Sequence, residues 1–487
     1  MAAPDYQWFV QHWQDSAHVQ LLDGYGRDAF IQRVRQRADD VGRTDHHTLI
    51  GHCLYRALYE PQRFGAMTTI LDDIQAPAAR VPQPVAGRPI DGPLRFDRRA
   101  ACDDAGAFPA LGFSAFWLPW AFEHNFDQFE RFCEYAAGAG ATYVRWFGSH
   151  DWSGGTNPRT HPRYWDLMEK TIQGLAEYRL RSQITLATRR HLIDDLFSFA
   201  RGWHAIVARH TDKVILVEMV NEADHADNGW SVEDLHTLGY NFRDSPARYA
   251  LTAPLGGPFV EMAETSTAHY QHPMGYTVDN DVRTFHFARK NTTAEGDWRP
   301  IRQPWHARFL PSYTAVINNE PRKWATTREQ SVEWAAVAPI VSWIAGCGCH
   351  CHHDQVGVFN NQGHYPDVEG ATQLAQVWGS VLPLLPGDLA NWSPCRVGET
   401  PERHPFPRLI DHHWPFENIR HGVSRAFAAV RDTRFVMALT GVRDHVPLDD
   451  VQPDPFQVYS LLTGACVYDG CGPVTLRDAQ AFLVVRL

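Results

Sequence analysis

Two glutamates stand just beyond short apolar runs of the chain. Residues 214–220 read VILVEMV and are followed by Asn221 and Glu222, and residues 313–317 read YTAVI, with Glu320 three positions later. Two facing carboxyls can cleave a glycosidic bond, because one donates a proton to the leaving oxygen while the other attacks the anomeric carbon or activates water. This placement predicts a catalytic pair. The simpler alternative is two surface-loop carboxylates.

The stretch 94–388 must position these two side chains. It opens with a predicted hairpin over 94–112 and then alternates short apolar runs with longer amphipathic ones. Alternating strands and helices with apolar strands predict a parallel sheet covered by helices, and eight such units predict a (β/α)8 barrel. The eight expected strands are 114–120, 142–148, 182–187, 213–222, 248–254, 282–288, 313–321 and 344–354. Functional side chains of such a barrel collect at the C-terminal ends of its strands.

The flanking segments differ from this central pattern. Residues 1–75 have apolar residues at helical spacing and predict a small helical domain. Residues 76–93 are rich in Pro, Ala and Gly and predict a linker. Residues 389–487 contain short apolar runs divided by Gly, Pro and Asp, which predict an antiparallel β-sandwich.

The motifs VEMVNE, ending at Glu222, and VINNEP, which contains Glu320, resemble those of the clan A glycoside hydrolases. The resemblance covers about 94–388. It implies a TIM barrel with an acid/base glutamate after strand four, here Glu222, and a nucleophile after strand seven, here Glu320. It also implies a carbohydrate substrate, a β-type glycosidic bond, and cleavage with retention through a glycosyl-enzyme.

The resemblance assigns roles to further residues. Arg145 stands where many clan members have an arginine near the nucleophile, and its charge would keep Glu320 ionised. The pKa of Glu222 should be raised by its negative neighbour across the cleft. Asn221 would hydrogen-bond the sugar 2-hydroxyl, and His286 stands where members often have a strand-six His or Tyr. The alternatives are that Arg145 only bridges barrel carboxylates and that His286 is a core histidine.

Several tryptophans near predicted strand ends could stack on sugar rings, although each could equally be packing. Trp146 is the one assigned to substrate binding, and the others are Trp117, Trp120, Trp152 and Trp230.

The eighth predicted strand departs from the clan pattern. It reads AGCGCHCHHD and lacks the tryptophan that forms the floor of the sugar site in several families, so His350 or His352 is expected to take that place. Strand alternation would put Cys347, Cys349 and Cys351 on one face and the two histidines on the other. Because a tetrahedral metal site needs converging ligands from separated pairs, we expect no metal and no cofactor here.

Bulk composition narrows the possible partners. A net charge of −11 argues against nucleic acid, which needs a concentrated basic surface. No apolar run reaches the ~20 residues of a membrane span, and the first residues lack a signal-peptide pattern, so we expect a cytoplasmic or virion-associated protein. The segment YQWFVQHWQDS is similar to leading segments of phage-encoded barrel proteins, which suggests protein docking through residues 1–75. The competing function is an inactive barrel used as a carbohydrate-binding or structural protein.

Overall fold

The computed structural model describes the greater part of the chain, with gaps. The described residues are 9–10, 12–15, 19, 27–40, 46–59, 87–152, 154–221, 226–243, 251–259, 282–287, 315–320, 332–359, 370–396, 425–440, 446–448, 455–471, 474–476 and 481–487.

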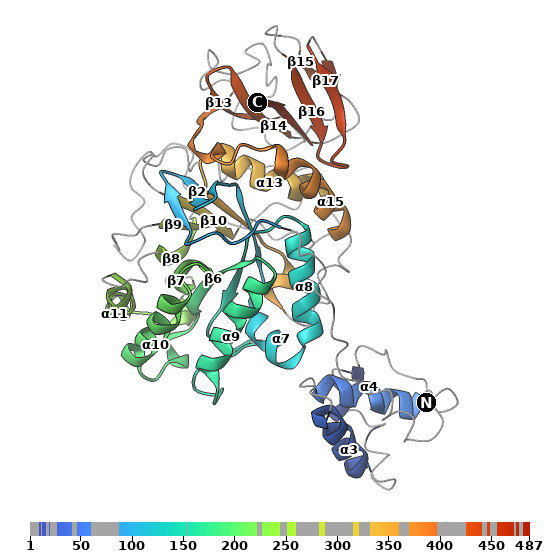
Figure 1. Cartoon of the computed structure of the whole chain (residues 1–487). Coiled ribbons are helices and arrows are strands. Elements are labelled where there is room, and N and C mark those ends of the chain that lie inside the picture. The colour runs from blue at the N-terminus through green and yellow to red at the C-terminus, as the bar shows by residue number, and fades with distance from the viewer. Residues whose placement is uncertain are drawn as a thin grey trace. The chain divides into compact units, whose positions relative to one another are not determined.

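Eight strands form a closed, all-parallel barrel (Figure 1). Consecutive strands are neighbours, and the last strand pairs with the first. The strands are β4 (Ala110–Ser114), β5 (Tyr143–Phe147), β6 (Arg181–Ala187), β7 (Val214–Asn221), β8 (Leu251–Phe259), β9 (Val282–Phe287), β10 (Ala315–Glu320) and β11 (Cys349–His352). The α/β barrel expected from alternating strands and helices is confirmed.

The first strand lies earlier than the sequence predicted. We expected it at 114–120, but β4 ends at Ser114 and the next element is helix α7 (Leu118–His124). The run SAFWLPW is apolar because its side chains are buried in a turn and a helix start: Trp117 donates its indole N–H to the carbonyl of Val356 at 2.7 Å. Pro119 fits the first helical turn, where a missing N–H is tolerated.

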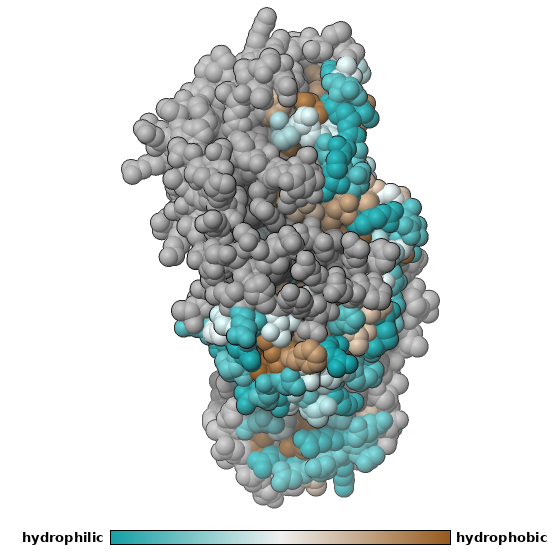
Figure 2. All heavy atoms as spheres, turned by 90° about the vertical axis from the view of Figure 1, so that its left-hand side faces the viewer, coloured by the Kyte–Doolittle hydropathy of each residue, from teal (hydrophilic) through white to brown (hydrophobic). Residues whose placement is uncertain are grey.

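Amphipathic helices cover the barrel strands. In α10 (Leu196–Arg209), Asp195 caps the N-terminus by accepting the Ser198 N–H at 3.1 Å, and apolar residues at helical spacing, such as Phe199 and Trp203, are buried. Figure 2 shows that the described surface on one face is mostly hydrophilic, with small apolar spots. In the described residues from 126 to 391, the other helical elements are α8 (Phe126–Gly138), α9 (Tyr164–Glu177), η3 (Arg190–Leu192), η4 (Ala226–Asn228), α11 (Val232–Arg243), α13 (Val332–Ile344), α14 (Gln355–Val358), α15 (Ala371–Val381), η8 (Leu382–Leu384) and η9 (Leu389–Asn391).

A small antiparallel sheet closes the N-terminal end of the barrel. It consists of β1 (Arg95–Asp97), β2 (Ala100–Asp103) and β3 (Gly106–Ala107), and replaces the simple hairpin expected at 94–112. Asp103, whose side chain is fully buried, accepts a hydrogen bond at 3.0 Å from Arg181 at the start of β6. Apolar side chains of this sheet and of the barrel interior form one core cluster.

The C-terminal part contains a six-stranded antiparallel sheet and a two-stranded one. The larger sheet has the order β12-β13-β14-β19-β16-β17, and the smaller pairs β15 with β18. One core cluster contains residues of both sheets, including Leu448, Met437 and Val484, so the two pack face to face. Their strands are β12 (Ser393–Arg396), β13 (Arg425–Arg431), β14 (Arg434–Thr440), β15 (Val446–Leu448), β16 (Phe456–Ser460), β17 (Cys466–Gly470), β18 (Val474–Leu476) and β19 (Ala481–Arg486).

Helix α13 joins the barrel to this sheet. It connects β10 to β11 and contacts β11 on one side and β13, β14 and β19 on the other. All of its residues are buried, as expected for a helix that is apolar all round.

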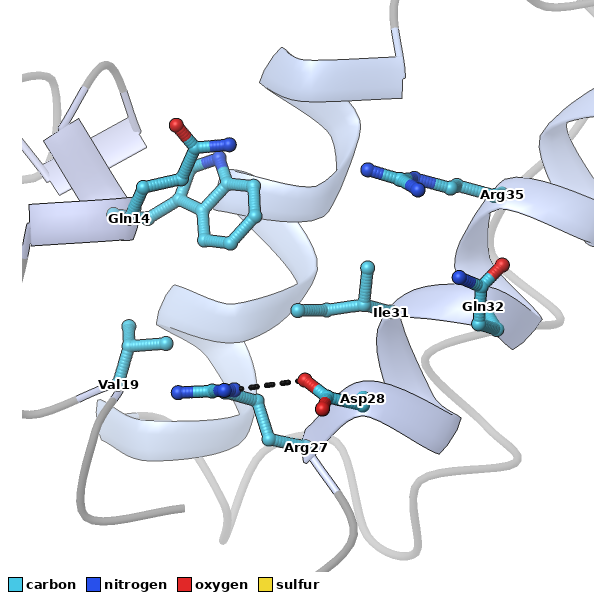
Figure 3. A pocket seen from close by; sticks show the side chains of 8 residues that line it. Gln14, Val19, Arg27, Asp28, Ile31, Gln32 and Arg35 are labelled. Carbon is cyan, nitrogen blue, oxygen red and sulfur yellow. Dashed lines mark hydrogen bonds and ion pairs between the residues drawn. The ribbon is translucent and has the colours of Figure 1, made fainter. Parts of the chain in front are cut away.

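The N-terminal helices form a separate unit with their own core. This unit comprises residues 1–84 together with 120–130, and its described helical elements within 1–84 include η1 (Trp13–Asp15), α3 (Arg27–Asp40) and α4 (His46–Tyr59). A pocket of about 390 Å³ lies between η1 and α3, with Gln14, Ile31 and Arg35 around it (Figure 3). Most of the predicted linker, 76–86, lies outside the described residues, and the boundaries of the four predicted segments stay predictions.

Candidate active site

Strand alternation divides the barrel side chains into an inner and an outer layer. Near the C-terminal ends of the strands the inner layer is polar and charged, whereas below it Tyr143, Ile317 and Cys349 belong to the apolar core cluster. The polar inner layer consists of Ser114, Arg145, Gln183, Thr185, Glu218 and Asn319, all buried.

An ion pair lies in this polar layer. Arg145 on β5 donates to Glu218 Oε2 on β7 through Nη2 at 2.8 Å and through Nε at 3.1 Å. Neither side chain is exposed to solvent. The same Nη2 donates to Asn221 Oδ1 at 3.0 Å. Arg145 therefore bridges a barrel carboxylate and the amide that precedes Glu222.

Neutral side chains complete the network around Glu218. Thr185 on β6 donates its hydroxyl to Glu218 Oε2, and Asn319 on β10 donates its amide to Oε1 at 3.0 Å. Asn319 in turn accepts a hydrogen bond from Gln183 Nε2. The network thus runs from β5 through β6 and β7 to β10.

An aromatic wall lies beside Arg145. Phe116 and Phe147 stack with ring centroids 3.8 Å apart, and the guanidinium lies 5.2 and 5.1 Å from the two centroids. His150 directs Nε2 at the carbonyl of Phe116, and burial lowers the pKa of His150 to about 4, so the ring is neutral at pH 7. A partly buried Trp152 packs 5.6 Å from Phe147 and is the predicted stacking residue that best fits this wall.

The predicted catalytic glutamates are only partly described. Glu222 lies outside the described residues. Glu320 is the last residue of β10, with its side chain outside the description. Its backbone pairs with that of His286 on β9, whose side chain is also not described. The roles of all three residues stay predictions.

Two of the residues assigned to substrate binding lie in the outer layer instead. Trp146 has no exposed surface and packs 6.0 Å from Trp203 of α10. His350 is buried, with Nδ1 2.9 Å from Ser342 Oγ of α13. Both residues face the helices rather than the barrel interior, so the structure does not bring them together with Arg145.

On β11 the alternation predicted from the sequence is observed. Cys349 and Cys351 belong to the inner core, while His352 packs against Trp378 of α15. Burial lowers the pKa of His352 to about 3. Cysteines and histidines thus diverge, and no cluster with metal-binding composition occurs among the described residues.

Sequence reasoning missed several inner-layer residues, among them His353, Glu218 and Asn319. His353 lies at the end of β11, with Nδ1 2.9 Å from Ser114 Oγ, and is the histidine of this segment that faces inward. Glu218 is a carboxylate within an otherwise apolar strand, which is itself a signal of a buried partner. Side chains two residues apart in a strand lie on the same face. Counting from Cys351 to His353 and from Ile317 to Asn319 would therefore have found His353 and Asn319.

Two further tryptophans of the predicted set serve packing. Trp117 and Trp230 are nearly fully buried, and each donates its indole N–H to a backbone carbonyl. Trp120 is half-buried. Within the described residues, no helix combines the length and hydrophobicity needed to cross a membrane.

Solved structures similar to this chain include glycoside hydrolases. A glycoside hydrolase family 5 protein from Bacteroides vulgatus matches with a TM-score of 0.54 and 12% identity, over 81% of this chain and 93% of that one. A second glycoside hydrolase matches with a TM-score of 0.55 and 13% identity, over 81% of this chain and 97% of that one. The chain shares the fold of these two proteins. No protein-family model and no curated protein matches the sequence.

The glycoside hydrolase fold confirms the resemblance inferred from VEMVNE and VINNEP at the level of the fold. It places the strand that ends beside Glu222 fourth and the strand that ends at Glu320 seventh around the barrel. No finding supports the phage association.

Proposed function

We propose that this protein is a retaining glycosidase that cleaves a β-type bond in a carbohydrate. Glu222 is the acid/base, and Glu320 is the nucleophile that forms a glycosyl-enzyme. The observation that carries the proposal is the buried network of Arg145, Glu218 and Asn319. It connects the C-terminal ends of β7 and β10, which Glu222 follows and Glu320 ends, respectively.

The chemistry follows from the two carboxyls. Glu320 Oε attacks the anomeric carbon while Glu222 gives its proton to the departing glycosidic oxygen, so the C–O bond to the leaving group breaks as the ester bond forms. Glu222, now ionised, then takes a proton from water, whose oxygen displaces Glu320. Asn221, held by Arg145, is oriented to hydrogen-bond the sugar 2-hydroxyl.

The test begins with a panel of aryl glycosides and polysaccharides. Glu320→Gln should abolish glycosyl-enzyme formation because the neutral amide cannot attack. Glu222→Gln should slow substrates with poor leaving groups by about 10²–10⁴-fold, and activated aryl glycosides less in the first step. Glu233→Gln, at an exposed carboxyl on α11, is the control and should keep wild-type rates.

Added azide separates the two roles. In Glu222→Ala, azide attacks the glycosyl-enzyme without base help, which restores turnover and gives a glycosyl azide of retained configuration. In Glu320→Ala, azide can only attack the substrate directly, which gives the inverted product. Activity that survives both glutamine changes would show that these residues are not the catalytic pair. Sugar binding without cleavage of any glycan would favour the carbohydrate-binding alternative.

A further inference from the structure

Glu218 carries a full charge where the chain is otherwise apolar. It occupies the fifth position of β7, VILVEMVN, and its side chain has no exposed surface. Removing an ionised carboxylate from water is costly unless charge and hydrogen bonds compensate. A buried carboxylate in a strand therefore needs neighbouring side chains that supply positive charge and hydrogen-bond donors.

The surroundings of Glu218 use both carboxylate oxygens. Oε2 accepts from Arg145 Nε, Arg145 Nη2 and Thr185 Oγ1, and Oε1 accepts from Asn319 Nδ2. An ionised carboxylate is an acceptor only, whereas a protonated one has to donate. These four hydrogen bonds all suit the ionised form, so we assign Glu218 a structural role rather than that of an acid/base residue.

The partners of Glu218 lead to both predicted glutamates. Arg145 also holds Asn221, which directly precedes Glu222. Asn319 directly precedes Glu320 in the chain. Glu218 is therefore linked to both strand ends that carry a predicted catalytic group. It reaches the end of β7 through Arg145, and it contacts Asn319 at the end of β10 directly.

We propose that Glu218 is a positioning residue, which fixes the ends of β7 and β10 relative to each other and balances the charge of Arg145 beneath the catalytic pair. That the pair is catalytic rests on the proposed function, whereas the contacts of Glu218 do not depend on it. With Glu218 in this role, Arg145 acts on the two glutamates as part of a nearly neutral pair rather than as a free cation.

The electrostatic consequence depends on the other groups in the barrel interior. Of the described cations, Arg145 is the one that contacts Glu218; Gln183, Thr185 and Asn319 are neutral. In the described part of the barrel interior, the other titratable groups include Tyr143 on β5, with Cys349, Cys351 and His353 on or just after β11. Burial raises the pKa of Tyr143 and of Cys349, which keeps both neutral. Removing the Glu218 charge therefore takes away a negative charge that lies directly against Arg145.

Glu218→Gln is suited to test this because the network can accept an amide. The glutamine oxygen can replace Oε2 facing Arg145, and its NH2 then replaces Oε1 facing Asn319. Asn319 can turn its amide over if Gln183 does the same. Within the described part of the chain, Gln183 Oε1 is buried without a hydrogen bond, so that turn gives it a donor.

The matched control is a second buried ion pair at the opposite end of the barrel. Asp103→Asn removes the same charge beside Arg181, the first residue of β6. Arg181 precedes Thr185 by four residues, which is about 13 Å along a strand. Both variants lose a buried charge and should be destabilised. Only Glu218→Gln should change the electrostatic field at the C-terminal strand ends, where Glu222 and Glu320 lie.

The experiment measures the pKa of Glu222 and Glu320 by carboxyl ¹³C NMR, with signals assigned from the Glu222→Gln and Glu320→Gln spectra. In Glu218→Gln both values should fall by about 1, because Glu218 then no longer offsets the positive charge of Arg145, and that charge favours ionised carboxyls. Both limbs of the pH–rate profile should move to lower pH with them. Glu218→Asp, which keeps the charge, should restore the wild-type values even if kcat falls.

Two results would overturn the inference: both pKa values unchanged in Glu218→Gln, or equal shifts in Glu218→Gln and Asp103→Asn. The carboxyl titration needs no turnover. A wild-type protein that cleaves no glycan would therefore refute the proposed function, while the titration would still decide the role of Glu218.

Discussion

The nine cysteines fall into two chemical classes. Cys466 and Cys471 are exposed, and the others are buried: Cys53, Cys102, Cys133, Cys347, Cys349, Cys351 and Cys395. Burial raises the pKa of Cys347 to about 12, which suppresses the reactive thiolate. All nine are free thiols.

This division predicts the reactivity of the native protein toward a thiol reagent such as DTNB. Two thiols should react rapidly, and seven should react only after unfolding. The double variant Cys466→Ser/Cys471→Ser should lose the rapid phase while keeping the seven slow groups. A third rapidly reacting thiol in the native state would contradict the burial described for the barrel and its helices.

At the residue scale, a side chain's alternate position along its strand decides whether it faces the barrel interior or the helices. Arg145 and Trp146 were both assigned to the site, yet only Arg145 faces inward. His350 was assigned where His353 faces inward. Composition marks both members of each pair as candidates, because polar and aromatic residues occur in both layers. The inner set became clear only once strand register fixed which positions face the barrel axis.

At the element scale, the strands found most readily are those with clear ends. The predicted 142–148, 182–187, 282–288 and 313–321 each contain, or nearly contain, the observed strand. The prediction of the first strand at 114–120 was wrong because a buried turn and a short helix can be as apolar as a strand. The predicted 248–254 covers only the first part of β8, whose PLGGP sequence lacks the β-branched residues that indicate strands.

Neighbouring barrel helices are held together by charge as well as by apolar packing. Glu169 on α9 accepts from Arg209 at the end of α10 at 2.8 and 2.9 Å and lies 2.8 Å from His210 Nε2. Hydrogen bonding from Arg209, with a smaller contribution from His210, lowers the pKa of Glu169 to about 2 against the opposing effect of burial.

Glu169→Gln should lower Tm at pH 7 by roughly 1–2 °C, as expected for a partly exposed pair in a chain of this size. A carboxyl whose pKa is depressed in the folded state stabilises above its unfolded pKa and loses that contribution as pH falls through the folded value. The difference from wild type should therefore shrink between about pH 4.5 and 2. Glu177→Gln on the same helix is the control. A difference in Tm that stays constant down to pH 2 would show that the ion pair is not its source.

At the scale of the whole molecule, the barrel and the C-terminal sheet share a core element. The sequence predicted a change of character near residue 389, and strands do follow that point. It gave no sign that α13 lies between the two layers, because a helix buried by a sheet and one buried by helices have the same apolar composition. Gln373 and Asp388 add polar ties to this part, to the Leu462 carbonyl at 2.7 Å and to Arg431.

This arrangement predicts unequal results for truncation at the two ends. A chain ending at Asn391 loses β13, β14 and β19, which exposes the apolar face of α13, VEWAAVAPIVSWI. It should be insoluble or bind ANS strongly, because a large exposed apolar patch favours association. A chain starting at residue 87 loses the helices before residue 85 but keeps residues 120–130 of the same unit. It should stay soluble, unfold cooperatively, and keep the full-length kcat on a small aryl glycoside, if the full-length protein cleaves one. Solubility and cooperative unfolding of the chain ending at Asn391 would show that the barrel folds without its C-terminal sheet. Aggregation of the chain starting at 87 would show that the helical unit belongs to the same cooperative structure.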